Sequence, residues 1–134
     1  MPSGLKYIAH QIISIAEAKE KPQIDVIKDY IKKVAEDYGV SLERAFFIVE
    51  KESQFESSRV GDTDKICPQG INKGKVQRAR GLWQINDCYH PEISDAVAFD
   101  IFASTDWAMP RVKNNPNIWS VWRFRKEWYK KSPE

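Results

Sequence analysis

The chain has 134 residues, of which 42% are hydrophobic and 30% charged, a composition typical of one soluble globular domain and not of a disordered chain. No apolar run approaches the about 20 residues of a membrane-spanning helix, so stable membrane insertion is not expected. The net charge of +2 is too small to favour nucleic acid as a partner, because nucleic-acid-binding domains concentrate basic residues far more strongly. We therefore expect a monomeric domain without a nucleic-acid partner.

The first 20 residues predict a helix, because Ile8, Ile12 and Ile15 recur on one face. Pro22 ends this helix. The segment does not fit a secretory signal peptide, because His10 interrupts its apolar run and no small-residue cleavage site follows.

Two further helices follow in the sequence. Apolar residues at helical spacing predict the first over 24–38, and Gly39 stands where a left-handed C-terminal cap is favoured. Ser41 is an N-cap candidate for the next helix, over 42–53. Both helices are expected to bury one apolar face.

The helical pattern is lost over 54–80, which is rich in Ser, Gly, Asp, Asn, Pro and Lys. A further helix is predicted to begin near Ser104 or Thr105 with Pro110 in its first turns, and a last one over 118–130. The expected fold is therefore mainly α, with any irregular or small β region confined to about 54–80. It divides one domain into N-terminal helices, a central segment and C-terminal helices, at 1–40, 41–86 and 87–134.

The two cysteines, Cys67 and Cys88, enclose a stretch rich in Gly, Lys and Arg that has little to pack against. A disulfide would hold this loop and contribute about 3 kcal/mol in the chain-entropy model. Two free thiols in a reducing compartment are the alternative. The two cysteines with the distant His10 and His90 do not make a convincing zinc site.

Glu52 lies on the apolar side of its predicted helix. At 100° per residue it projects between Ala45 and Ile48, whereas Glu50 falls on the polar face. Burial of a carboxyl group disfavours its charged form and raises its pKa, and a proton kept near neutral pH suits a general acid. The alternative is that Glu52, at the helix end, turns outward or caps a backbone group.

Two motifs carry a resemblance to a known superfamily. Glu-Ser-Gln-Phe at 52–55 is followed, after an irregular loop with Gly61-Asp62, by Gly-Leu-Trp-Gln-Ile-Asn at 81–86. This ordered pair resembles the lysozyme-like superfamily, and most closely the soluble lytic transglycosylases and goose-type lysozymes. The resemblance covers roughly 41–86 by motif. It implies a lysozyme-like fold in which the 54–80 region forms one side of a glycan cleft.

The resemblance implies a role for each matched position. Glu52 matches the catalytic glutamate, and Ser53 matches a serine that supports it by hydrogen bonding. Gln84 and Ile85 match the cleft wall that contacts the saccharide. Trp83 stands where many relatives have Met, so its ring is a candidate to stack on a sugar or, alternatively, a core residue.

The two motifs do not by themselves identify a second catalytic carboxylate. Most glycosidases use two carboxylates, and the candidates here are Asp62, Asp64 and Asp87, of which Asp62 is best placed to face Glu52 across a cleft. Asp62 then holds a water or stabilises the oxocarbenium-like transition state; Gly-Asp is also a common turn. Without such a partner, Glu52 acts first as acid and then as base, closing a 1,6-anhydro ring on the muramoyl sugar.

The implied activity is cleavage of peptidoglycan glycan strands at the β-1,4 bond between N-acetylmuramic acid and N-acetylglucosamine, by a lytic transglycosylase or a muramidase. No metal or organic cofactor is implied. Transglycosylases usually carry a later Ala-Tyr-Asn-type motif, which is absent after Asn86 and leaves the two outcomes open. A non-catalytic module of the same fold, binding glycan or protein, is the alternative. Wall cleavage implies an extracytoplasmic place of action: periplasmic, secreted or phage-delivered.

Overall fold

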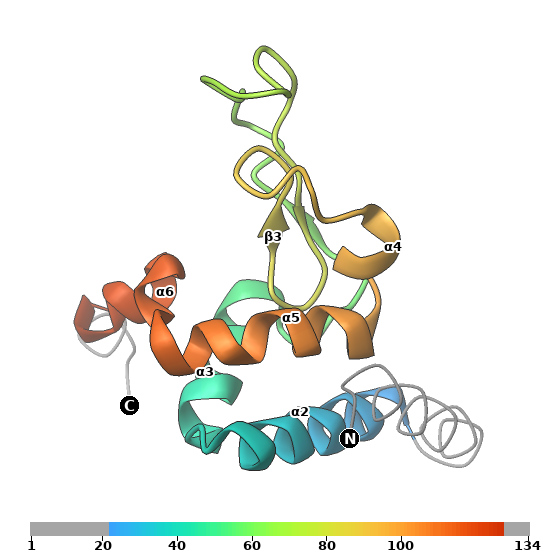
Figure 1. Ribbon diagram of the computed structural model, residues 1–134, viewed down its shortest axis with the longest axis vertical. Coiled ribbons are helices and arrows are strands. Elements are labelled where there is room, and N and C mark those ends of the chain that lie inside the picture. The colour runs from blue at the N-terminus through green and yellow to red at the C-terminus, as the bar shows by residue number, and fades with distance from the viewer. Residues whose placement is uncertain (1–21, 128–134) are drawn as a thin grey trace.

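The computed structural model describes residues 22–127, and its helices lie beneath a small sheet with long connections (Figure 1). The expected helix over the first 20 residues and the end of the expected last helix lie outside this range. In chain order the elements are α2 (Gln23–Tyr38), α3 (Leu42–Ser53), β1 (Val60–Gly61), β2 (Ala79–Arg80), β3 (Ile85–Asn86), α4 (Asp95–Ala98), α5 (Ile101–Asn114), the 3-10 helix η1 (Pro116–Ile118) and α6 (Ser120–Arg123). The prediction of a mainly α fold with a small β region is confirmed.

The predicted helices α2 and α3 are confirmed, together with their caps. Gly39 ends α2 with φ of 68°, a left-handed conformation that costs glycine little. At the start of α3, the Ser41 hydroxyl accepts a hydrogen bond from the backbone N–H of Arg44 at 3.4 Å. The two helices pack against each other and against α5, and their apolar faces form half of the core.

Helix α5 begins earlier than predicted, at Ile101. Asp100 is its N-cap, because the carboxylate accepts hydrogen bonds from the backbone N–H groups of Phe102 and Ala103 at 3.0 and 2.7 Å. Pro110 therefore lies inside the helix and not in its first turns. The earlier start places Thr105 in the buried middle of the helix, where it faces the sheet side of the molecule.

The three short strands form an antiparallel sheet in the order β1-β2-β3. The sheet extends beyond the predicted 54–80 region, since β3 pairs Ile85 with Arg80 and Asn86 with Ala79. The turn between β2 and β3 depends on Gly81, which has φ of 76° and whose position leaves no room for a Cβ against the Ala98 carbonyl oxygen. The second sequence motif is therefore a tight hairpin lying on the α4–α5 junction.

The chain after α5 differs from the single long helix predicted over 118–130. Trp119 separates η1 from α6 with an extended backbone (φ −90°, ψ 114°). Its side chain is buried, and its Nε1–H donates to the Trp83 carbonyl oxygen at 3.0 Å. Burial of this indole under the hairpin holds the chain in a shape that a continuous helix cannot adopt. None of the helices between residues 22 and 127 combines the length and apolar character needed to cross a membrane.

Candidate active site

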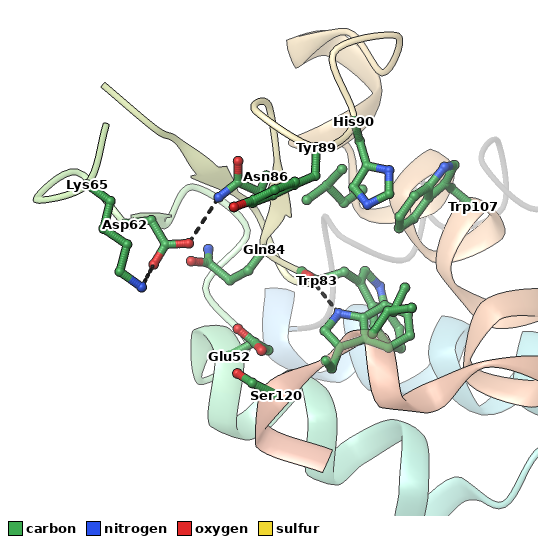
Figure 2. A pocket seen from close by; sticks show the side chains of 13 residues that line it. Glu52, Asp62, Lys65, Trp83, Gln84, Asn86, Tyr89, His90, Trp107 and Ser120 are labelled. Atoms are coloured by element: carbon green, nitrogen blue, oxygen red, sulfur yellow. Dashed lines mark hydrogen bonds and ion pairs between the residues drawn. The ribbon is translucent and has the colours of Figure 1, made fainter. Parts of the chain in front are cut away.

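A cavity of about 440 Å³ opens between the end of α3, the sheet and the C-terminal segment (Figure 2). It is lined by residues from both sides of the molecule: Glu52, Asp62, Lys65, Trp83, Gln84, Ile85, Asn86, Tyr89, His90, Trp107, Ile118, Trp119 and Ser120. The cleft thus brings together Glu52, Asp62 and the 81–86 motif, which are far apart in the chain. Among the described residues, no group of three or more His, Cys, Asp and Glu side chains is placed to hold a metal ion.

Glu52 lies in the last turn of α3 and its half-buried side chain points into the cleft (Figure 2). Burial is the main cause that raises the pKa of the Glu52 carboxyl from its ordinary value of 4.5 to about 7, and the negative charge of Asp62 adds to it. The helix ends directly after this position, because Gln54 adopts a left-handed conformation with φ of 55°. Glu52 is thus held at a helix end, facing the cavity.

Ser53, the neighbour of Glu52, points into the protein. Its side chain is fully buried, and its hydroxyl donates to the Val49 carbonyl oxygen at 3.1 Å within α3. Arg59 Nη1 donates to the Ser53 carbonyl oxygen at 3.5 Å. Ser53 therefore anchors the helix end that presents Glu52, and it is not part of the cleft lining.

Asp62 faces the same cleft from the loop that follows β1 (Figure 2). Its Oδ2 accepts a hydrogen bond from Asn86 Nδ2 at 3.1 Å, and its Oδ1 lies 3.4 Å from Lys65 Nζ. Asp62 has φ of 61°, a left-handed conformation that is uncommon outside glycine. The structure thus places Asp62 where its charge acts on Glu52. By contrast, Asp87 forms an ion pair with Arg78 and does not line the cleft.

The residues predicted to contact the saccharide differ in exposure. Trp83 is 0% exposed and its Nε1–H donates to Thr105 Oγ1 at 3.0 Å, so its ring offers no free face for a sugar. Gln84 lies at the cleft surface with φ of 50°, and its Nε2 donates to the Gly81 carbonyl oxygen at 3.0 Å. Ile85 lines the cavity but is nearly fully buried. Of these three, Gln84 has the most side chain available to a ligand.

The motifs did not indicate a second group of cleft residues. Tyr89 lines the cavity with 58% of its surface exposed, directly after the Gly-Leu-Trp-Gln-Ile-Asn motif. His90 packs against Trp107 with ring centroids 5.0 Å apart, and Arg111 covers the Trp107 ring at 4.0 Å. Burial lowers the pKa of His90, which favours the neutral imidazole near neutral pH. Proximity to the 81–86 motif is the sequence signal that could have indicated Tyr89 and His90.

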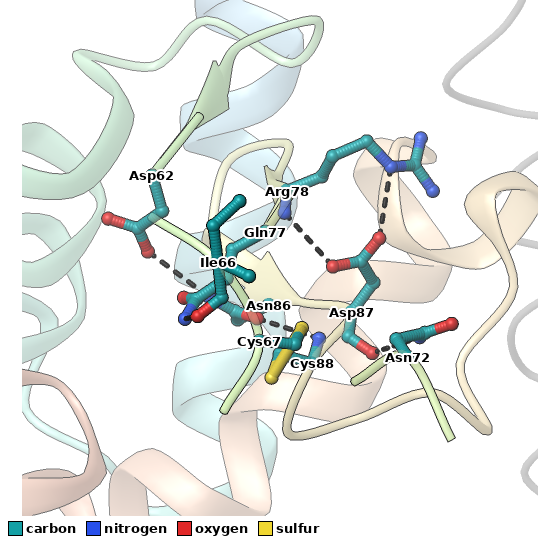
Figure 3. Close-up of a disulfide and its surroundings, with 9 residues drawn as sticks. All are labelled: Asp62, Ile66, Cys67, Asn72, Gln77, Arg78, Asn86, Asp87 and Cys88. Atoms are coloured by element: carbon teal, nitrogen blue, oxygen red, sulfur yellow. Dashed lines mark hydrogen bonds and ion pairs between the residues drawn. A yellow bond between two sulfur atoms is a disulfide. The ribbon is translucent and has the colours of Figure 1, made fainter. Parts of the chain in front are cut away.

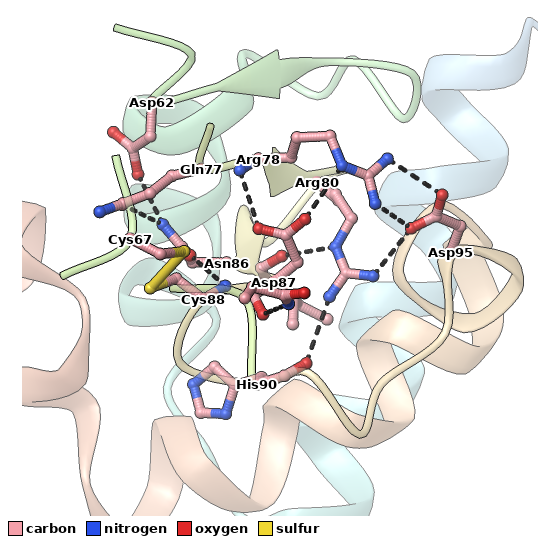
Figure 4. A network of polar contacts seen from close by, with 12 residues as sticks. Asp62, Cys67, Gln77, Arg78, Arg80, Asn86, Asp87, Cys88, His90 and Asp95 are labelled. Carbon is pink, nitrogen blue, oxygen red and sulfur yellow. Dashed lines mark hydrogen bonds and ion pairs between the residues drawn. A yellow bond between two sulfur atoms is a disulfide. The ribbon is translucent and has the colours of Figure 1, made fainter. Parts of the chain in front are cut away.

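The wall of the cleft is held by covalent and polar links away from the cavity. Cys67 and Cys88 form a disulfide with their Cα atoms 5.6 Å apart (Figure 3). The buried Arg80 guanidinium donates to the Ile85 carbonyl oxygen at 2.9 Å and to Asp95 Oδ1 at 2.9 Å (Figure 4). Hydrogen bonds from the nearby guanidinium groups lower the pKa of the Asp95 carboxyl, so it stays ionised. These links join the strands to the segment that precedes α4.

The mainly α fold, the small antiparallel sheet and a cleft containing a buried carboxyl define the lysozyme-like class that the two motifs predicted. A family model described as the transglycosylase SLT domain matches residues 29–105. The match covers more than half of the chain, so the protein belongs to the transglycosylase SLT domain family. The predicted resemblance is confirmed. Comparisons with curated proteins and with solved structures give no significant match.

The family match spans both parts of the cleft. It begins within α2, ends within α5, and includes the segments 52–55 and 81–86. The description of the family names a transglycosylase domain. The family model thus covers the segments that carry Glu52, Asp62 and Gln84.

Proposed function

We propose that this protein cleaves the β-1,4 bond between N-acetylmuramic acid and N-acetylglucosamine in peptidoglycan, with Glu52 as general acid. The supporting observation is the Glu52 carboxyl, half-buried in the cleft with a pKa raised to about 7. At pH 7 about half of such groups hold a proton, against about 0.3% at the ordinary pKa of 4.5. A protonated carboxyl is required to donate to the leaving glycosidic oxygen.

In the first step Glu52 donates its proton to the glycosidic oxygen as the bond to the muramoyl C1 breaks. The N-acetyl group of the same sugar stabilises the positive charge that develops at C1. Glu52 is left as a carboxylate, and the departing sugar leaves with a free 4-hydroxyl. Burial that disfavours the charged form of Glu52 also makes it a ready base for the next step.

In the second step, Glu52 accepts the proton of the muramoyl 6-hydroxyl while O6 bonds to C1. The product is a 1,6-anhydro-muramoyl end, and no water is consumed. Membership in the transglycosylase family supports this route. Hydrolysis is the second candidate, because Asp62 is an additional carboxylate in the cleft, placed to orient a water molecule.

The sheet side of the cleft supplies side chains suited to contact a glycan strand. Gln84 lies near Glu52, and Tyr89 lies farther from it along the cavity, with its ring partly exposed (Figure 2). An exposed aromatic ring and side-chain amides suit the apolar faces and hydroxyl groups of sugars. The Cys67–Cys88 disulfide agrees with action in an oxidising, extracytoplasmic compartment.

The test is release of muropeptides from purified peptidoglycan by the native chain and by Glu52→Gln. We expect a loss of at least about a thousandfold in Glu52→Gln, because the amide cannot donate and re-accept the proton. The matched control is Glu50→Gln, which changes an exposed carboxyl on the same helix. Full activity of Glu52→Gln, or an equal loss in Glu50→Gln, contradicts the proposal.

Mass spectrometry of the released fragments separates the two outcomes. Anhydro-muropeptides indicate transfer, and reducing muramic acid ends indicate hydrolysis. If the native chain binds the wall polymer but releases neither product, it acts as a non-catalytic module.

A further inference from the structure

Asn86, at the end of β3, connects Asp62 in the cleft to the disulfide-bonded part of the sheet side (Figure 3). Its Nδ2 donates to Asp62 Oδ2 at 3.1 Å and to Gln77 Oε1 at 2.9 Å. Its Oδ1 accepts from the backbone N–H of Cys88 at 2.7 Å. Both N–H donors and the oxygen of the Asn86 amide are therefore engaged.

The orientation of the Asn86 amide follows from its fixed neighbours. A backbone N–H can only donate, so the Cys88 N–H requires the amide oxygen on its side. The NH₂ group must then face Asp62 and Gln77. Asn86 consequently presents a donor, and not an acceptor, to the Asp62 carboxylate.

The amide of Gln77, which faces the Asn86 amide, also has a fixed orientation. Its side chain is buried, and its Nε2 donates to the Ile66 carbonyl oxygen at 3.1 Å. Because a carbonyl oxygen can only accept, the Gln77 amide oxygen must face Asn86. The disulfide between Cys67 and Cys88 joins the two backbone segments that carry Ile66 and Cys88, so both anchor points are covalently linked (Figure 3).

Lys65 is the other side chain in contact with the Asp62 carboxylate, but it is a weaker restraint. The Lys65 side chain is 60% exposed, and exposed ion pairs contribute little because solvent screens them. The charged groups described around Asp62 are thus Lys65 from its own loop and Glu52 from α3. Asn86, in contrast, is itself held by two buried residues, through the Gln77 side chain and the backbone N–H of Cys88.

We propose that Asn86 is a positioning residue, which holds the Asp62 carboxylate in a set place opposite Glu52. The inference rests on the proposed function, since it concerns the surroundings of the proposed acid. Burial is the main cause that raises the pKa of Glu52, and the negative charge of Asp62 adds to it, so the position of Asp62 affects how tightly Glu52 holds its proton. The sheet side in this way adds to the pKa shift of a residue on the helical side.

The first test is the pH profile of kcat/KM for Asn86→Ala. We expect a loss of about tenfold, the size of one charge-assisted hydrogen bond, and a fall in activity that begins at lower pH than in the native chain. The matched control is Asn72→Ala, which removes another side-chain amide of the sheet side, bonded to the Asp87 carbonyl oxygen at 2.9 Å and outside the cleft lining. An unchanged profile in Asn86→Ala, or the same shift in Asn72→Ala, overturns the proposal.

A second test does not depend on catalysis. Carbon-13 NMR titration of the Glu52 carboxyl measures its pKa directly, also in a chain without activity. We expect Asn86→Ala to lower that pKa in the native background and to have no further effect in Asp62→Asn. Equal shifts in both backgrounds overturn the inference even if Glu52→Gln proves inactive, and a Glu52→Gln that cuts peptidoglycan overturns the proposed function alone.

Discussion

The two sides of the cleft are held together by different forces. The helical side, made of α2, α3 and α5, is an apolar core in which the faces of three helices meet. The sheet side has strands of two residues each and relies on a disulfide, buried amides and an arginine network. The proposed acid Glu52 comes from the first side, and Asp62, the other carboxylate in the cleft, comes from the second. Burial thus raises the pKa of the Glu52 carboxyl, whereas a hydrogen bond from Asn86 holds the Asp62 carboxylate in place.

The largest expected effect comes from deleting apolar volume on the helical side. Ile31→Ala should lower the free energy of unfolding by about 3 to 4 kcal/mol, because Ile31 is 0% exposed in α2. Ile71→Ala on the sheet side, where Ile71 is 80% exposed, should change it by no more than about 0.5 kcal/mol. Denaturant unfolding measures the loss in each variant. Similar losses in Ile31→Ala and Ile71→Ala would contradict the expected difference between the two sides.

Removal of the disulfide should act on the sheet side first. The double variant Cys67→Ser, Cys88→Ser should lose about 3 kcal/mol in the chain-entropy model. Hydrogen exchange should accelerate over 60–88 more than in α2, because the helical core has its own packing. If hydrogen exchange accelerated equally over the whole chain, the sheet side and the helical side would unfold as one cooperative unit.

Glu52 should make stability fall as pH rises. Its pKa in the folded protein, about 7, lies above the ordinary 4.5, so the folded state binds more protons between these values. The stabilising contribution is complete below about pH 4.5 and is lost as pH rises through 7. Between pH 5 and 8 the native chain should lose about 2 to 3 kcal/mol relative to Glu52→Gln. If the free energies of unfolding of the native chain and of Glu52→Gln changed with pH in the same way, the raised pKa of Glu52 would be contradicted.

The smallest expected effect belongs to the exposed ion pair of the sheet side. Lys65→Ala should change the free energy of unfolding by less than about 1 kcal/mol, because solvent screens its contact with Asp62. It should also reduce kcat/KM less than Asn86→Ala does. A larger loss in Lys65→Ala would mean that charge, and not the anchored amide, holds Asp62.

The helical side was largely predictable from the sequence because its signals are local. Periodic apolar residues and the caps Gly39 and Ser41 gave the bounds of α2 and α3 within one residue. The start of α5 was placed too late because the capping role of Asp100 was overlooked. The single helix expected after 118 was wrong because burial of Trp119, a tertiary effect, breaks it.

The sheet side was less predictable, and so was its part of the cleft. Strands of two residues have no periodicity to detect, so β3 was missed although its motif was recognised. The motif left Trp83 as either a sugar platform or a core residue, and only the packing shows that its ring is enclosed. Asn86 and Tyr89 were missed because their surroundings depend on contacts between distant segments.

The glycine at the hairpin turn has a consequence for mutational tolerance. Gly81 combines a positive φ with a backbone contact to Ala98 that excludes a Cβ, so alanine fails there for two separate reasons. The next residues, Leu82 and Trp83, are buried in the core, and Gln84 follows in the cleft. In a library that samples all amino acids at each position, 81 should accept glycine alone. Sequence variation in the lining of the cleft must therefore arise before or after position 81.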